Sequence, residues 1–165
     1  MAEHGLMNGT SATTFEPDGT ITRAMVVTIL YRISGEPAVS GNSGFSDVPS
    51  GRYYSNAIKW ATDKGIAKGV GGGKFDPDAP VTREQMSTFL MRYAKFKGKS
   101  TSTSTSLSGY TDAGKVSSWA VDAVKWSVGN GIIVGTTATT LDPESTATRA
   151  QFATIVHRYL DKFGG

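Results

Sequence analysis

The chain repeats itself, and this internal repeat restricts its possible folds more than any other feature of the sequence. The same short motif occurs three times, as Ile21-Thr22-Arg23, Val81-Thr82-Arg83 and Ala147-Thr148-Arg149. The first and second copies are 60 residues apart, and the second and third are 66 apart. A period of this length is typical of an array of small units, each of which buries its apolar face against the next.

A second block of similarity precedes this motif in two of the copies. Phe45-Ser46-Asp47-Val48 corresponds to Tyr110-Thr111-Asp112-Ala113, and Ala57-Ile58-Lys59-Trp60 corresponds to Ala123-Val124-Lys125-Trp126. In the first copy, the position that matches Trp60 falls just before Met1. We therefore expect two complete repeats and a first repeat that lacks most of its first helix.

Apolar side chains after each Thr-Arg pair recur with the spacing of an amphipathic helix. Met86, Phe89, Leu90 and Tyr93 stand at i, i+3, i+4 and i+7, and the same positions are apolar in the other two copies. Residues 54–61 show the same spacing and predict a shorter, earlier helix. Each full repeat is therefore predicted to be helix, Gly-rich loop, helix, which makes the fold all-α.

Composition excludes several kinds of site. The chain has no cysteine, so neither disulfides nor thiolate metal sites can form. Its net charge of +3 is dispersed, which does not predict a nucleic-acid surface, and no apolar run reaches the length of a membrane span. His4 and His157 have no repeated partners. We therefore expect no metal site, no cofactor and no catalytic group.

The combined motif resembles the S-layer homology domain family over nearly the whole chain. The segments that carry the resemblance are Phe45-Ser46-Asp47-Val48-Pro49, Ala57-Ile58, Trp60, Gly65-Ile66 through Gly69, Phe75-Asp76-Pro77 and Val81-Thr82-Arg83-Glu84. The resemblance implies a pseudo-threefold unit of three repeats, in which the first helices form a central bundle and the second helices form prongs.

The resemblance also divides the chain into repeats and linkers. The expected units are repeat 1 (1–34, its C-terminal half only), a linker (35–44), repeat 2 (45–97), a Ser/Thr-rich linker (98–109) and repeat 3 (110–163). Ala150-Gln151 departs from the family pattern, in which Glu commonly follows the Arg-Ala pair.

In function, the resemblance implies a non-enzymatic anchor of a bacterial surface protein, located outside the cell in the wall or S-layer. Its expected partner is a secondary cell wall polysaccharide with pyruvylated amino sugars, bound in grooves between repeats. Neither nucleic acid nor membrane is an expected partner. The alternative is a structural or self-assembly module, in which a homo-oligomer or an exchanged helix completes repeat 1.

The three repeated arginines are the main candidate binding residues. Thr22, Thr82 and Thr148 are predicted helix N-caps, so Arg23, Arg83 and Arg149 become the first residues of their helices. A cation there opposes the helix dipole at a cost of roughly 0.3–1 kcal/mol. This repeated placement indicates an anion site built from free helix N–H groups and a guanidinium, which suits a pyruvyl carboxylate. The alternative is that each Arg pairs with an acidic residue of another repeat.

Further candidates have two interpretations each. Asp47 and Asp112 are turn or cap residues, or bind sugar hydroxyls. Trp60 and Trp126 are core residues, or stack on a sugar. Tyr53 and Trp119 are expected to pack.

Two more pairs complete the candidate site. Gln85 and Gln151 complete capping boxes with Thr82 and Thr148 and lie beside the arginines. Gly69 and Gly135 occupy loops that could bring backbone N–H groups near a ligand. Gly65 and Gly131 are predicted to end the first helices in the left-handed conformation. We expect the grooves at Arg23 and Arg83 to bind, and the one at Arg149 least.

Overall fold

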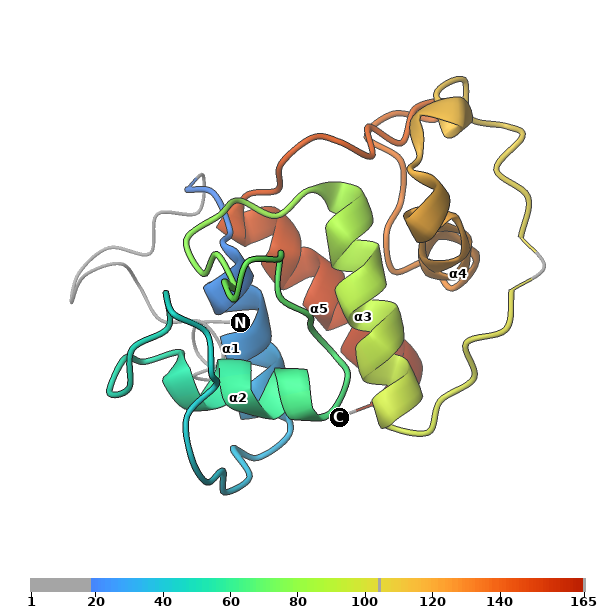
Figure 1. Cartoon of the computed structure of the whole chain (residues 1–165). Coiled ribbons are helices and arrows are strands. Elements are labelled where there is room, and N and C mark those ends of the chain that lie inside the picture. Colours follow the sequence, from blue (N-terminus) through green and yellow to red (C-terminus); the bar gives the residue numbers. More distant parts are fainter. Residues whose placement is uncertain (1–18, 104, 165) are drawn as a thin grey trace.

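The computed structural model describes residues 19–103 and 105–164. In these ranges the chain forms five α-helices and no β-strand (Figure 1), which confirms the all-α prediction. The helices are α1 (Arg23–Ile33), α2 (Ser55–Asp63), α3 (Arg83–Phe96), α4 (Val121–Gly129) and α5 (Arg149–Phe163), with short 3₁₀ helices η2 (Ala113–Lys115) and η3 (Ser118–Ala120) before α4. Residues 1–18, where repeat 1 was predicted to lack most of its first helix, lie outside the described residues.

The starts of α1, α3 and α5 follow the predicted capping pattern. Thr22, Thr82 and Thr148 are the N-caps, and each side chain accepts a hydrogen bond from the backbone N–H three residues later. In α3 and α5 the Gln at that position also accepts a hydrogen bond from the cap backbone N–H, which completes both predicted capping boxes. These caps place an arginine at the first position of each helix.

The ends of α2 and α4 follow the predicted glycine pattern. Gly65 and Gly131 have φ values of 74° and 69°, in the left-handed region that favours glycine. The N–H of Ile66 donates to the carbonyl of Ala61 at 2.8 Å, and Gly65 donates to Thr62 at 3.2 Å. This pair of bonds is the Schellman arrangement, which satisfies the last carbonyls of the helix.

The three Thr-Arg motifs meet in a closed ring of backbone hydrogen bonds. Ile21 donates to Ala147 (3.0 Å), Ala147 donates to Val81 (3.0 Å), and Val81 donates to Ile21 (3.1 Å). All three side chains are buried, with at most 1% of their surface exposed. Three segments far apart in the sequence therefore share one hub, from which α1, α3 and α5 begin.

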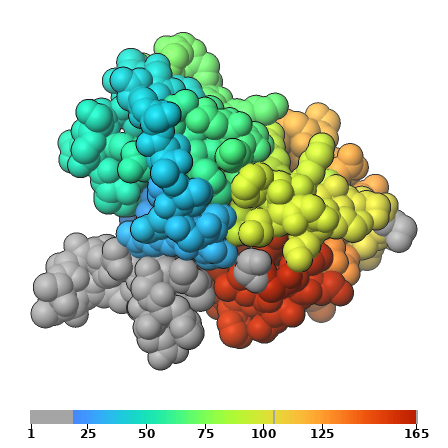
Figure 2. Space-filling model, turned by 90° about the horizontal axis from the view of Figure 1, so that it is seen from below, coloured from blue at the N-terminus to red at the C-terminus, as the bar shows by residue number. Residues whose placement is uncertain are grey.

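The helices that begin with arginine are also joined by individual side-chain contacts. The Tyr93 and Tyr159 rings join α3 to α5 at 5.6 Å, the hydroxyls of Ser34 and Tyr93 lie 3.2 Å apart, and Arg149 contacts Met25 between α5 and α1. Figure 2 shows the segments that end these helices adjoining on one face.

The shorter helices lie outside this group: α2 packs on α1, and α4 packs on α3 (Figure 1). The expected arrangement, with first helices central and second helices as prongs, is therefore not confirmed, because in the described residues the second helices meet at the hub. Both helices of a repeat carry an apolar stripe, so periodicity alone could not assign the centre. None of the described helices has the length and apolar character needed to cross a bilayer.

Candidate functional site

A groove lies where residues of three repeats meet, and we call it the Arg23 groove. Its cavity volume is about 160 Å³. The lining residues are Arg23 from α1, Lys68, Gly69 and Val70 from the loop after α2, Gln85, Thr88, Phe89 and Arg92 from α3, and Trp119 from η3. The α3 members stand at i, i+3, i+4 and i+7, so they form one stripe along that helix. The groove thus combines cationic, polar and aromatic groups.

Arg23 is fixed in the floor of this groove. Its Nε donates to the carbonyl of Phe75 at 2.9 Å, and Nη2 donates to the carbonyl of Lys68 at 2.7 Å. The guanidinium lies over the rings of Phe75 and Phe89, 4.6 and 5.5 Å from their centroids. Only 8% of the residue is exposed, and burial lowers the pKa of the guanidinium. These contacts hold the loop after α2 against α1.

Arg83 repeats this arrangement one repeat later. Its Nε donates to the carbonyl of Leu141 at 2.8 Å, and its Nη2 donates to the carbonyl of Val134. Arg149 is likewise buried, 5% exposed, and its Nη1 contacts the sulfur of Met25 at 3.7 Å. The acidic partners considered in the alternative for Arg23 and Arg83 are thus replaced by backbone carbonyls. The guanidinium fork suits two such acceptors at once.

The helix N–H groups beside these arginines are already bonded within the protein. At the start of α3, Arg83 donates to Ser145 (2.9 Å), Glu84 donates to Pro143 (3.0 Å), and Gln85 donates to the hydroxyl of Thr82 (3.3 Å). At the start of α1 the first three N–H groups are bonded in the same way. At α1 and α3 the expectation of free N–H groups for an anion is therefore wrong, because carbonyls of the next repeat and the Thr caps occupy them. A ligand beside Arg23 or Arg83 must therefore use groups other than these helix N–H groups.

Asp47 and Asp112 cap the loop of their own repeats. The carboxylate of Asp47 accepts hydrogen bonds from the N–H groups of Phe75 (2.9 Å) and Asp76 (2.8 Å). Asp112 accepts the matching pair from Leu141 and Asp142. Desolvation raises the pKa of Asp47, but these bonds outweigh it and lower the pKa below its usual value. At both positions the turn-and-cap interpretation describes the contacts.

The two glycines of the loops are required by close approach. A Cβ on Gly69 would lie 2.6 Å from the Phe45 ring and 2.8 Å from the carbonyl oxygen of Lys74. A Cβ on Gly135 would lie 2.4 and 2.5 Å from the carbonyl oxygens of Thr137 and Thr140. Gly69 lines the Arg23 groove, so this tight packing shapes the groove wall.

The aromatic residues fall into a buried pair, for which the core interpretation holds, and an exposed pair, for which the packing expectation is wrong. Trp60 and Trp126 are 1% and 0% exposed, so their ring faces are not accessible to a sugar. Tyr53 and Trp119 were expected to pack, but they are 61% and 59% exposed. Trp119 lines the Arg23 groove and is the indole available to a ligand. A period of 3.6 residues identifies one face of a helix, but here these exposed aromatics precede α2 and α4, where that period does not apply.

Several groove residues were missed by sequence reasoning, among them Lys68 and Val70, and two others carry a signal in the repeat register. Thr88 matches Thr28 and Thr154, and Arg92 matches Arg32 and Arg158, at the same offsets as the Thr-Arg motif. Among the described residues, no group of three or more His, Cys, Asp or Glu side chains is placed to hold a metal ion.

Comparison with known proteins agrees with the repeat. The family model described as "S-layer homology domain" matches residues 1–24, 44–87 and 109–153, which together are more than half of the chain. These three stretches contain the three Thr-Arg motifs.

Several larger bacterial proteins contain a region that is similar to nearly the whole of this chain. The chain is 30% identical to "Exoglucanase XynX" of Acetivibrio thermocellus over 162 residues, and 30% identical to "Surface-layer 125 kDa protein" of Lysinibacillus sphaericus over 164 residues. In each case 98% of this chain is covered, but only 15% and 13% of the relative. It is also 27% identical to "Cellulosome-anchoring protein" of Acetivibrio thermocellus over 155 residues, which cover 90% of this chain and 34% of the relative.

Proposed function

Because this chain belongs to the S-layer homology domain family, we propose that it anchors a bacterial surface protein to the cell wall without a covalent bond. The names of its relatives support this proposal, since they include a surface-layer protein and a cellulosome-anchoring protein. Enzymes among the relatives share this region as a small fraction of their length, 15% for the exoglucanase. We therefore assign binding to this region and no catalysis.

The ligand in this proposal is a secondary cell wall polysaccharide that carries pyruvylated amino sugars. The observation that carries it is the Arg23 groove, which combines cationic, polar and aromatic groups on one surface. An exposed indole such as Trp119 offers a flat apolar face to a sugar ring. Guanidinium groups bind a carboxylate through paired hydrogen bonds.

The proposal includes a second groove at Arg83, related to the first by the repeat. Arg83 holds the loop of repeat 3 as Arg23 holds that of repeat 2, through a pair of carbonyls each. Gly135 and Gln151 then take the places of Gly69 and Gln85. Cyclic contacts at the hub support a pseudo-threefold unit of three repeats.

The experiment is co-sedimentation of the chain with purified bacterial walls. We expect it to pellet with walls that carry the acidic polymer and to stay in solution with peptidoglycan from which the polymer has been removed. Trp119→Ala should weaken pelleting while the thermal unfolding midpoint stays unchanged, because this side chain is 59% exposed. Equal pelleting with both wall preparations would contradict the polymer as ligand.

A further inference from the structure

A second arginine recurs in the repeat, and the Thr-Arg motif does not include it. Arg32, Arg92 and Arg158 each stand nine residues after the first arginine of α1, α3 and α5. All three are half-buried. A half-buried guanidinium needs a counter-charge or a hydrogen-bond acceptor, so the partners of these three arginines are of interest.

Arg92 lies in the same groove as a second cation, Arg23. It lies in the Arg23 groove on the same stripe of α3 as Gln85 and Thr88. The structure gives Arg92 no hydrogen bond or ion pair with another described residue, and burial lowers the pKa of its guanidinium. Burial chiefly, and the charge of Arg92 in addition, lower the pKa of Arg23, against the opposing effect of Asp76. Two guanidinium groups therefore line one groove, and an anion placed between them would be attracted by both charges.

By the repeat register, Arg158 and Arg83 correspond to Arg92 and Arg23, each displaced by one repeat in the sequence. Burial chiefly lowers the pKa of Arg83, and the positive charge of Arg158 lowers it further, against the effect of Asp142. Like Arg92, Arg158 is half-buried and has no hydrogen bond or ion pair with another described residue. The paired arginines thus occur twice. One pair is the first residue of α1 with the tenth residue of α3, and the other is the first residue of α3 with the tenth residue of α5.

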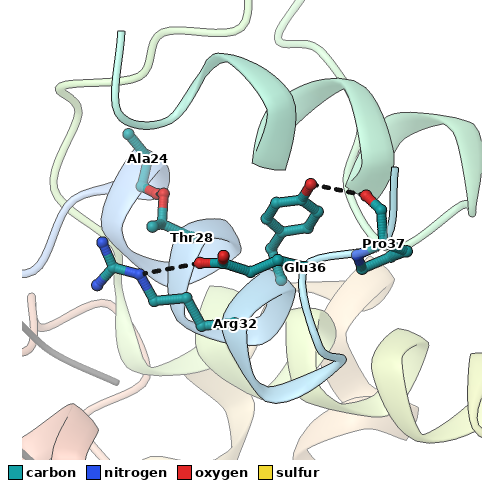
Figure 3. A network of polar contacts seen from close by, with 6 residues as sticks. Ala24, Thr28, Arg32, Glu36 and Pro37 are labelled. Atoms are coloured by element: carbon teal, nitrogen blue, oxygen red, sulfur yellow. Dashed lines mark hydrogen bonds and ion pairs between the residues drawn. The ribbon is translucent and has the colours of Figure 1, made fainter. Parts of the chain in front are cut away.

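Arg32 differs, because its own chain supplies the counter-charge. Its Nε lies 3.8 Å from a carboxylate oxygen of Glu36, four residues later and beyond the end of α1, as Figure 3 shows. The positions that match Glu36 in the other repeats are Phe96 and Lys162, neither of which is acidic. The ion pair at Arg32 is therefore specific to repeat 1.

We propose that Arg92 and Arg158 bind the acidic group of the ligand, and that Arg23 and Arg83 are the fixed second cations of the same two sites. Arg23 and Arg83 each donate hydrogen bonds from Nε and Nη2 to loop carbonyls. The donors of Arg92 and Arg158 remain available to a carboxylate. The inference rests on the proposed function for the identity of the polymer. The ligand class is an acidic saccharide whose carboxylate sits between two guanidinium groups.

The first test uses pyruvate as the probe and NMR of the indole N–H groups as the readout. The chain has three tryptophans, and Trp60 and Trp126 are buried, so they serve as internal references for Trp119. We expect pyruvate to shift the Trp119 signal alone, and Arg92→Gln to weaken this response about tenfold or more. Lys97→Gln removes an exposed charge after the same helix and should change it by no more than about twofold. No shift in the parent, or an equal shift in Arg92→Gln, overturns the proposal.

The second test measures binding of the wall polymer itself. Arg92→Gln and Arg158→Gln should each weaken binding, and the double variant should weaken it most, while circular dichroism and thermal unfolding stay as in the parent. If the parent binds polymer and the double variant binds equally well, the role of these arginines is refuted and anchoring survives. If pyruvate binds through Arg92 but the parent does not bind polymer, the anion site stands and wall anchoring fails.

Discussion

Glu84 accepts two hydrogen bonds from Ser117, one from the backbone N–H at 2.9 Å and one from the hydroxyl at 2.6 Å. Glu84 is the second residue of α3 and only 5% exposed, and Ser117 precedes η3 of the next repeat. A single carboxylate thus links the Arg-bearing helix of repeat 2 to the segment that carries Trp119. The matching residues of the other repeats are Ala24 and Ala150, so this link is made once.

Replacing this carboxylate should destabilise the fold. Glu84→Ala leaves the N–H of Ser117 without its partner, and we expect the free energy of unfolding to fall by about 1–3 kcal/mol. Urea unfolding followed by circular dichroism measures the change. Glu144→Ala, which removes an exposed carboxylate, is the control and should leave the midpoint unchanged. An unchanged midpoint in Glu84→Ala would show that the link contributes nothing.

Arg23→Lys should lower stability although it keeps the charge. Lysine has no planar fork, so it cannot reach the carbonyls of Phe75 and Lys68 together or lie flat over the ring of Phe75. We expect a loss of about 1.5–3 kcal/mol in the free energy of unfolding. Arg52→Lys, at an exposed position, is the matched control. Equal urea midpoints for both variants would refute the structural role of Arg23.

Acid should weaken the loops through Asp47 and Asp112. The folded chain lowers the pKa of both below the ordinary value of 3.8, at Asp112 chiefly through the N–H of Leu141. Their contribution to stability is therefore present above pH 3.8 and is lost as the pH falls through the folded pKa. Asp47→Asn should flatten this part of the plot of unfolding free energy against pH. A plot as steep as that of the parent would contradict the assignment.

The sequence predicted the elements of this fold better than their arrangement. Caps at Thr82 and Thr148 and the glycine ends of α2 and α4 depend on neighbouring residues, so local patterns suffice. The donors of Arg23 and Arg83 reach carbonyls more than forty residues away, which no local pattern encodes. The same long-range packing occupies the helix N–H groups that a local argument leaves free.

In the candidate site, too, some residues could be predicted from local sequence patterns and others could not. Arg23 was predicted because a cation at the start of a helix opposes the helix dipole. Its contacts with the carbonyls of repeat 2 explain this placement. Arg92 breaks no rule within a helix, so its only signal was the shared offset with Arg32 and Arg158. Trp119 precedes its helix, where no periodicity separates a groove residue from a packed one.

The exposed face of α5 predicts the oligomeric state. On α1, Tyr31 packs against Trp60 of α2 with ring centroids 5.4 Å apart. The matching residue of α5 is His157, which is exposed and pairs with Asp161 at 3.3 Å. A polar surface of this kind does not favour burial under a helix of another chain. We expect native mass spectrometry to give a single species of 17.4 kDa, and a stable dimer would instead support the self-assembly alternative.

The central claim is that the grooves hold an acidic wall polysaccharide through arginine. Isothermal titration of this chain with native wall polymer, and with the same polymer stripped of its pyruvate, tests it most directly. We expect measurable binding of the native polymer and a loss of about tenfold or more in affinity for the stripped one. Equal affinity for the two polymers, or no binding of either, would contradict it.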